Sequence, residues 1–135
     1  MPNGREQRHK DKIELAEERI SNIREWHKEK ADLKSRLATY KAFQEAAEAL
    51  MDICAMICKD NGKTVKDDYG NIETLEAMKV IGEKLGGLLK EINGMRNRIV
   101  HEYNGFSYSI FSGNVERLLG GMEEFIGAVE KWAGK

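Results

Sequence analysis

Proline is absent from this chain after position 2, and that absence constrains the fold more than any motif does. Proline interrupts helices because it lacks a backbone N–H and its ring clashes with the preceding turn. A chain of 135 residues with a single proline can therefore form long, continuous helices. Its apolar residues also recur every three or four positions, which places them on one face of an α-helix. The sequence predicts an all-α protein.

The apolar repeat and the turn residues between its segments predict the number and length of the helices. We expect helices over residues 12–26, 33–59, 72–80, 83–103 and 109–132. The second helix is the longest, about 40 Å at 1.5 Å per residue, and should frame the core. Gly62 follows it as a candidate left-handed cap. Residues 1–10 are expected to be a flexible tail, which leaves one domain over residues 11–135.

The charge balance limits what the chain can bind. Charged residues make up 33% of the sequence, yet the net charge is only −1. This argues against a general nucleic-acid-binding protein, so any contact with RNA must be local, through a few arginines and lysines. There is no signal peptide and no apolar stretch of about 18 residues. We therefore expect a cytoplasmic protein that does not enter the membrane.

Two features resemble metal sites but are better explained as structure. Cys54 and Cys58 lie one helical turn apart in an apolar segment with no histidine nearby in sequence, and are expected to be small buried hydrophobic residues. Asp67 and Asp68 belong to a loop rich in turn residues that lacks the ligand pattern of a calcium-binding loop. We expect no metal and no cofactor.

Besides Gly113, six glycines fall inside the last two long predicted helices, although each costs roughly 1 kcal/mol against alanine there. We expect some of them to allow close approach between these two helices or across a dimer, around the motif described next. The six are Gly86, Gly87, Gly94, Gly120, Gly121 and Gly127.

A cation, an amide, an imidazole and a phenol gather within eight positions of the fourth predicted helix. They belong to Arg96, Asn97, His101 and Tyr103. Asn97 and His101 are one turn apart on one face, whereas Arg96 and His101 are about 140° apart around the helix axis. Both can reach one target only through a long arginine side chain or a second copy of the helix. The alternative is a surface arginine and a structural histidine, because this spacing often arises by chance.

These four side chains could carry out acid–base catalysis on a phosphodiester. An imidazole can take up or release a proton near neutral pH, and a guanidinium offers a planar fork of donors to phosphate oxygens. Asn97 could orient either the imidazole or the phosphate. No metal is required if the RNA 2′-OH is the nucleophile and developing charge is stabilised by the arginine.

The residues Arg96-Asn97-x-x-Val100-His101-x-Tyr103 resemble the R-N-x-x-V-H-x-Y signature of the HEPN superfamily, in its HepT-like branch. Residues 40–54 resemble the long second helix of that branch, and residues 122–126 its C-terminal helix. The resemblance covers about residues 12–132. It implies an antiparallel bundle of four to five helices with one long second helix.

What the resemblance implies for function is a metal-independent endoribonuclease, the toxin of a HepT/MntA-type toxin–antitoxin pair. It implies a homodimer with its cleft at the dimer interface, where His101 is the acid and base, Arg96 holds the scissile phosphate and Asn97 assists. It also implies a nucleotidyltransferase antitoxin, MntA-like, that transfers AMP to Tyr103 and so places bulk and negative charge beside Arg96. Two alternatives stay open: a non-catalytic nucleotide- or partner-binding subunit of a nucleotidyltransferase complex, and a purely structural bundle.

Overall fold

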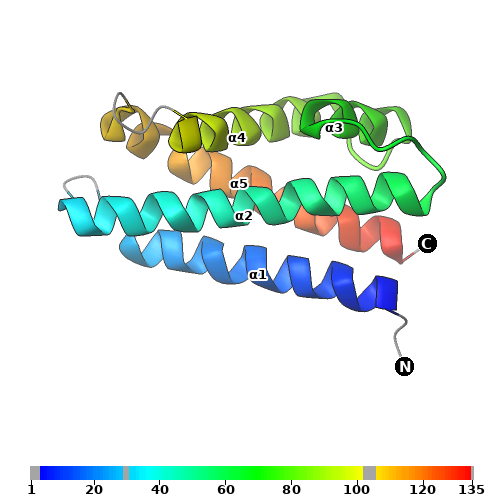
Figure 1. Cartoon of the computed structure of the whole chain (residues 1–135), viewed down its shortest axis with the longest axis horizontal. Helices are drawn as coiled ribbons and strands as arrows, with labels where there is room; N and C mark the ends of the chain where they lie inside the picture. The colour runs from blue at the N-terminus through cyan, green and yellow to red at the C-terminus, as the bar shows by residue number, and fades with distance from the viewer. Residues whose placement is uncertain (1–3, 29–30, 102–105, 135) are drawn as a thin grey trace.

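Helix α2 is the central element in the computed structural model of the chain (Figure 1). The structure describes residues 4–28, 31–101 and 106–134. Their helices are α1 (Gly4–Trp26), α2 (Leu33–Asp60), α3 (Asp68–Ala77), α4 (Glu83–His101) and α5 (Tyr108–Ala133). No strand occurs among these described residues, so the prediction of an all-α bundle is confirmed.

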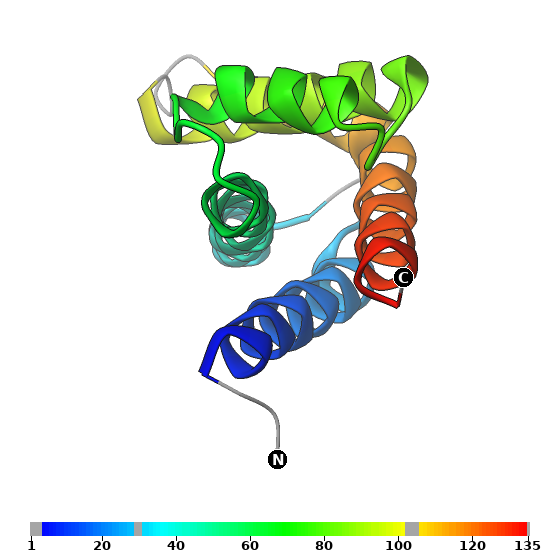
Figure 2. The same cartoon turned by 90° about the vertical axis from the view of Figure 1, so that its right-hand side faces the viewer.

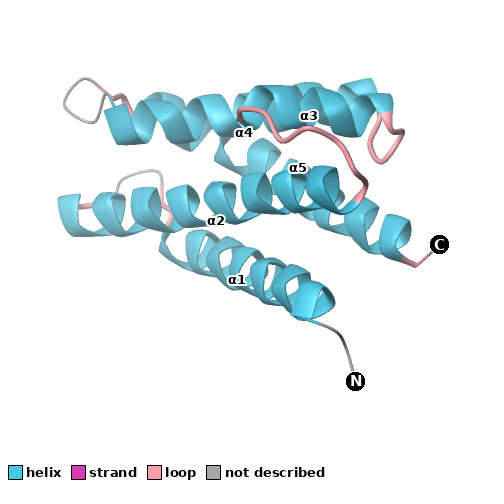
Figure 3. Ribbon diagram, turned by 45° about the vertical axis from the view of Figure 1, so that its right-hand side comes forward, coloured by secondary structure: helices cyan, strands magenta, loops and turns pink. Residues whose placement is uncertain are grey.

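The arrangement leaves α1 and α4 on opposite sides of α2. Helix α2 contacts all four other helices, whereas α1 packs along α2, touches α5 and makes no contact with α3 or α4. The end-on view in Figure 2 shows α3 and α4 on one side of α2, α1 on the other, and α5 completing the bundle. Loops join α2 to α3 and α3 to α4, and Figure 3 draws them in pink. No helix in the described ranges is long and apolar enough to cross a membrane.

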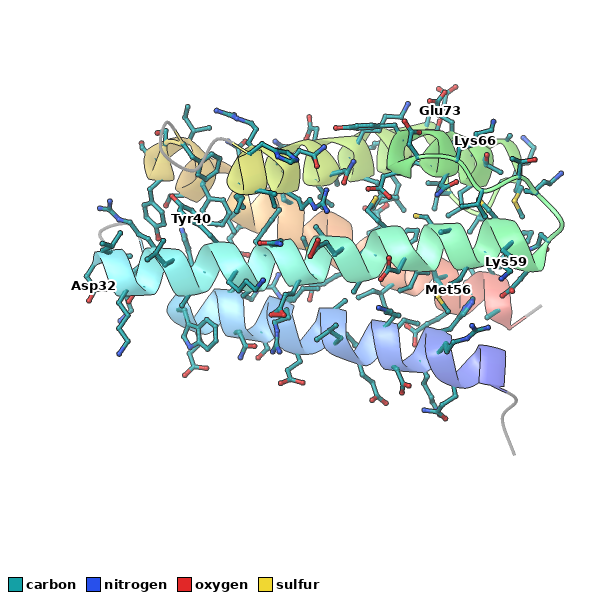
Figure 4. The ribbon with its side chains drawn as sticks, viewed as in Figure 1. Asp32, Tyr40, Met56, Lys59, Lys66 and Glu73 are labelled. Atoms are coloured by element: carbon teal, nitrogen blue, oxygen red, sulfur yellow. The ribbon has the colours of Figure 1, made fainter. Side chains whose placement is uncertain are left out.

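The helices begin and end at residues whose side chains or backbone suit those positions. Asp32, labelled in Figure 4, accepts a hydrogen bond of 2.8 Å from the backbone N–H of Ser35 and caps α2. Asp67 caps α3 and Ser107 caps α5 in the same way. Gly62 has a φ of 71°, so its predicted role as a left-handed residue after α2 is confirmed.

Two helix starts differ from the sequence prediction. Residues 4–10, expected to belong to a flexible tail, form the first turns of α1. The segment is charged and has no apolar stripe, but it lies along α2, where His9 Nε2 is 3.2 Å from Asp60 Oδ2; Lys12, just after it, bonds Asp52 at 2.8 Å. Helix α3 starts at Asp68 and not at residue 72, because Asp67 supplies an N-cap four positions earlier.

An aromatic cluster closes the end of the core where α1 gives way to α2. Phe111 at the start of α5 is fully buried and is its centre. Its ring lies 5.2 Å from that of Tyr40, which is labelled in Figure 4, and 5.5 Å from that of Phe43. His27, Phe106 and Tyr108 complete the cluster. A hydrogen bond of 2.9 Å between His27 Nε2 and Ser112 Oγ joins the residue after α1 to α5.

The two cysteines are buried as the sequence predicts. Cys54 and Cys58 are free thiols with no exposed surface, facing the core from α2. Burial raises the pKa of both thiols above its usual value. Since the thiolate is the reactive form, neither side chain is suited to chemistry at neutral pH.

The predicted close approach of α4 and α5 is confirmed at Gly121 alone of the six glycines, and there it meets Leu88, two turns before Arg96. A Cβ on Gly121 of α5 would lie 2.5 Å from Leu88 Cδ2 of α4, and one on Gly86 would lie 2.3 Å from Glu76 Oε1 of α3. Gly94 has one ordinary contact, with Tyr69. Gly87, Gly120 and Gly127 have open space where a Cβ would be. Close packing therefore explains only part of the set.

The adjacent glycines of α5 make a matched test of this packing. We expect Gly120→Ala to raise the free energy of unfolding by about 0.5–1 kcal/mol, because alanine is the better helix former and nothing obstructs it. Gly121→Ala should lower it, because Leu88 must move and overpacking costs about 1–3 kcal/mol. Urea denaturation of both variants measures the difference. Equal changes of the same sign would contradict the close approach of α4 and α5.

Candidate active site

Arg96 projects from α4 toward α2 and is held by two hydrogen bonds. Its Nη2 donates to Glu48 Oε2 of α2 at 3.0 Å, and its Nη1 donates to Asn97 Oδ1 at 2.7 Å. Its Nε is buried and has no acceptor. The side chain is 24% exposed. The guanidinium is thus fixed in place, and its buried Nε–H finds no acceptor among the described residues.

His101 is the last residue of α4 and is exposed. Its imidazole makes no hydrogen bond, ion pair or ring contact with any residue that the structure describes. Asn97 lies one turn before it, but the Asn97 carbonyl accepts from Arg96 and not from the imidazole. Within one chain, the structure therefore joins Arg96 and Asn97 and leaves His101 separate.

A pocket of about 460 Å³ opens beside Arg96 between α1, α2, the start of α3 and α4. Two cations and four carboxylates line it: Lys12, Arg96, Glu45, Glu48, Asp52 and Asp68. Three of the carboxylates are already paired, Glu48 with Arg96, Asp52 with Lys12 and Glu45 with Arg19. Carboxylates in excess repel a phosphate, so this side of the arginine is unfavourable for an RNA backbone.

Asp68 is the fourth carboxylate of this pocket and the one for which no ion pair is found among the described residues. Burial raises the pKa of Asp68 above its ordinary value, and the positive charge of Arg96 acts in the opposite direction. The sequence analysis assigned Asp68 to a solvated loop, whereas it begins α3 and is half-buried. Carboxylates of α2 and α3 therefore contribute to the electrostatic potential at Arg96.

Glu48 is the functional candidate that the sequence analysis did not identify. It is 39% exposed and its partner lies 48 residues further along the chain, so no local pattern links the two. The available signal was a lone carboxylate in the otherwise apolar run Ala46-Ala47-Glu48-Ala49-Leu50. A charge in such a run usually has a partner.

Tyr103, the predicted AMP acceptor, lies outside the described residues, as does the predicted end of the helix at Tyr103 and Asn104. The described part of α4 ends at His101. Among the described residues, no group of three or more histidine, cysteine, aspartate or glutamate side chains is placed to hold a metal ion.

Known proteins are similar to this chain in sequence and in fold. The profile of the family described as "Ribonuclease HepT-like" matches residues 10–129. The chain belongs to the HepT-like ribonuclease family. Two proteins of Archaeoglobus fulgidus that carry the name "Putative RNase" are similar to it. One is 36% identical over 93% of both chains, and the other is 39% identical over 89% of this chain and 86% of its own length.

Solved structures share the HepT-like fold over almost the whole chain. A toxin–antitoxin complex with AMP-PNP contains a chain with a TM-score of 0.85 and 21% identity, covering 95% of this chain and 99% of that one. The tri-AMPylated HEPN toxin of Shewanella oneidensis in complex with its MNT antitoxin has a TM-score of 0.86 and 22% identity. That match covers 96% of this chain and 99% of the toxin. These likenesses establish the HEPN-type helical bundle.

Proposed function

We propose that this HepT-like chain is a metal-independent endoribonuclease and the toxin of a toxin–antitoxin pair. The observation that carries the proposal is the exposed imidazole of His101, which has no partner among the described residues and ends the helix that carries the fixed guanidinium of Arg96. The family assignment and the two archaeal relatives named as RNases support the reaction class.

The reaction needs only proton transfer and charge stabilisation. The RNA 2′-oxygen attacks the neighbouring phosphorus, and its proton passes to an imidazole acting as base. The bond from phosphorus to the 5′-oxygen breaks, and an imidazolium returns a proton to that oxygen. Arg96 stabilises the charge that develops on the phosphate. The products are a 2′,3′-cyclic phosphate and a 5′-hydroxyl.

We place this reaction in a cleft between two copies of the chain. Within one chain Arg96 is bonded to Glu48 of α2 and to Asn97, and no hydrogen bond joins it to His101 among the described residues. A second α4 facing the first would bring two imidazoles and two guanidinium groups to one groove. The imidazoles could then divide the base and acid roles, with Asn97 keeping each Arg96 in position.

The partner we propose is a nucleotidyltransferase antitoxin that transfers AMP to Tyr103. Support comes from the likeness to a tri-AMPylated HEPN toxin bound to an MNT antitoxin. Tyr103 follows His101 by two positions, so an adenylate there would add negative charge where the RNA phosphate approaches. Co-expression with the nucleotidyltransferase of the same cell should add whole AMP masses at Tyr103, and a stable complex with unmodified Tyr103 would refute this part.

Cleavage of RNA by the purified chain alone tests the main proposal. We expect cleavage in EDTA, products that end in a 2′,3′-cyclic phosphate, and no cleavage where the attacking nucleotide is 2′-deoxy. Cleavage that requires added metal would refute the mechanism. The absence of any cleavage by a folded protein would favour the second candidate.

That second candidate is a non-catalytic subunit that binds a nucleotide or partner through Arg96. The ion pair between Arg96 and Glu48 and the excess of carboxylates in the adjoining pocket favour it, because both oppose entry of an RNA backbone from that side. Binding of RNA or nucleotide without cleavage, unchanged by His101→Ala, is its expected signature.

A further inference from the structure

A second pocket lies at the N-terminal end of α4. Its lining is mainly positive, whereas the lining of the pocket beside Arg96 is mainly negative. This second pocket has a volume of about 360 Å³ and lies between the turn from α3 to α4 and the last turns of α5. Three lysines line it, Lys79, Lys84 and Lys131, against the single carboxylate of Glu124. In Figure 2 this turn and the end of α5 both face the viewer.

The three lysines form no ion pair with the residues that the structure describes. Within the described ranges, no hydrogen bond of these side chains is found either. Six other cations in these ranges, by contrast, form ion pairs: Lys12, Arg19, Arg24, Lys90, Arg96 and Arg117. Three unpaired ammonium groups in one pocket repel each other. An anion bound between them would offset this electrostatic repulsion.

Lys79 occupies a backbone position that disfavours lysine. Its φ is 62°, in the left-handed region, and its neighbour Val80 donates to Leu75 O at 3.0 Å to close the end of α3. Glycine is usual at this position, since other residues cost about 1–2 kcal/mol there. Lysine is therefore not explained by the requirements of the turn, whereas a role for its charge in the pocket does explain it.

Two further features suit a nucleotide phosphate. Helix α4 starts at Glu83, so its free backbone N–H groups and the positive end of its dipole lie beside the pocket at Gly82 and Lys84. Trp132 is half-buried and lines the same hollow, where its indole offers a surface for a base. Phosphate-binding cations beside an aromatic ring are the usual pattern of single-strand recognition.

We propose that this pocket, lined by Lys79, Lys84, Lys131 and Trp132, binds the backbone and one base of single-stranded RNA away from the scissile bond. The inference rests on the proposed ribonuclease function. Along the axis of α4, about 25 Å separates Lys84 from His101, so one strand of several nucleotides spans both. RNA is then held by charges remote from Arg96, whose own surroundings are too acidic to attract it.

The test uses Trp132 as an internal reporter. The chain has two tryptophans, and Trp26 lies at the end of α1, so Trp26→Phe leaves Trp132 as the single fluorophore. The His101→Ala change is added to prevent cleavage. We expect a single-stranded RNA oligonucleotide to quench Trp132, and 5′-AMP at the same phosphate concentration to do so far more weakly. Equal quenching by AMP would identify a mononucleotide site and overturn the RNA assignment.

Charge variants in the same background complete the test. Lys84→Gln/Lys131→Gln should weaken RNA binding on the order of tenfold and lower the slope of log K against log salt by about 1.4, the value for two lost phosphate contacts. Arg8→Gln/Lys10→Gln is the matched control, because both cations are exposed on α1, which makes no contact with α4. We expect that control to bind as the parent does.

The outcomes separate this inference from the proposed function. If the unaltered chain cleaves RNA but both double variants bind it equally well, the pocket is not an RNA site and the ribonuclease proposal stands. If the parent binds no RNA, both proposals fail together. Loss of binding in the lysine variant with unchanged melting temperature supports the pocket.

Discussion

Replacing His101 by alanine is expected to reduce RNA cleavage by about 10²–10⁴-fold, the usual contribution of a positioned acid or base. The fold should not change, because His101 is exposed and forms no contact with the described residues. Single-turnover cleavage and a melting curve on the same preparation measure the two quantities. His101→Gln, which keeps hydrogen bonding but cannot transfer the proton, should be as inactive as His101→Ala.

The corresponding change at Arg96 needs a structural control. Arg96→Ala should also abolish cleavage and relieve growth arrest on expression, but it leaves Glu48 without its partner and removes a link between α4 and α2. Glu48→Gln removes the same ion pair while keeping the guanidinium. If Glu48→Gln retains cleavage and Arg96→Ala does not, the arginine acts on the substrate. Equal losses in both variants would assign Arg96 a purely structural role.

The largest effect on stability is expected at Phe111. Phe111→Ala should lower the free energy of unfolding by about 3–5 kcal/mol, because it removes a buried ring and leaves a cavity at the centre of the aromatic cluster. Ile110→Ala is the matched control: its side chain is 47% exposed, and we expect a change below about 0.5 kcal/mol. Urea denaturation with tryptophan fluorescence measures both. A small effect at Phe111 would mean that the cluster does not stabilise this end of the bundle.

Most of the fold could be predicted from apolar spacing alone. The prediction for α2, residues 33–59, differs from the observed Leu33–Asp60 by one residue, and that for α5, residues 109–132, by one at each end. Both helices have a regular buried face. The first turns of α1 were missed because they lack such a face and are held by charged contacts to α2, which no local pattern reveals.

The candidate site could be predicted less completely. The angle between residues five apart in a helix predicts that Arg96 and His101 lie about 140° apart around α4, and the hydrogen bonds of Arg96 to Glu48 and Asn97 do not include His101. The partner of Arg96 could not be predicted, because Glu48 comes close only when α2 packs against α4. The acidic pocket beside Arg96 and the lysine pocket at the other end of α4 could not be predicted either, because each is lined by residues that are far apart in the sequence.

The buried thiols of α2 make the chain convenient for site-specific labelling. Maleimide reagents require an accessible thiolate, and neither Cys54 nor Cys58 offers one in the folded protein. A single cysteine introduced at Leu33, whose side chain is 69% exposed, can thus carry a dye or spin label without removal of the native cysteines. Distances between labels on two copies would then test whether two chains pair as proposed.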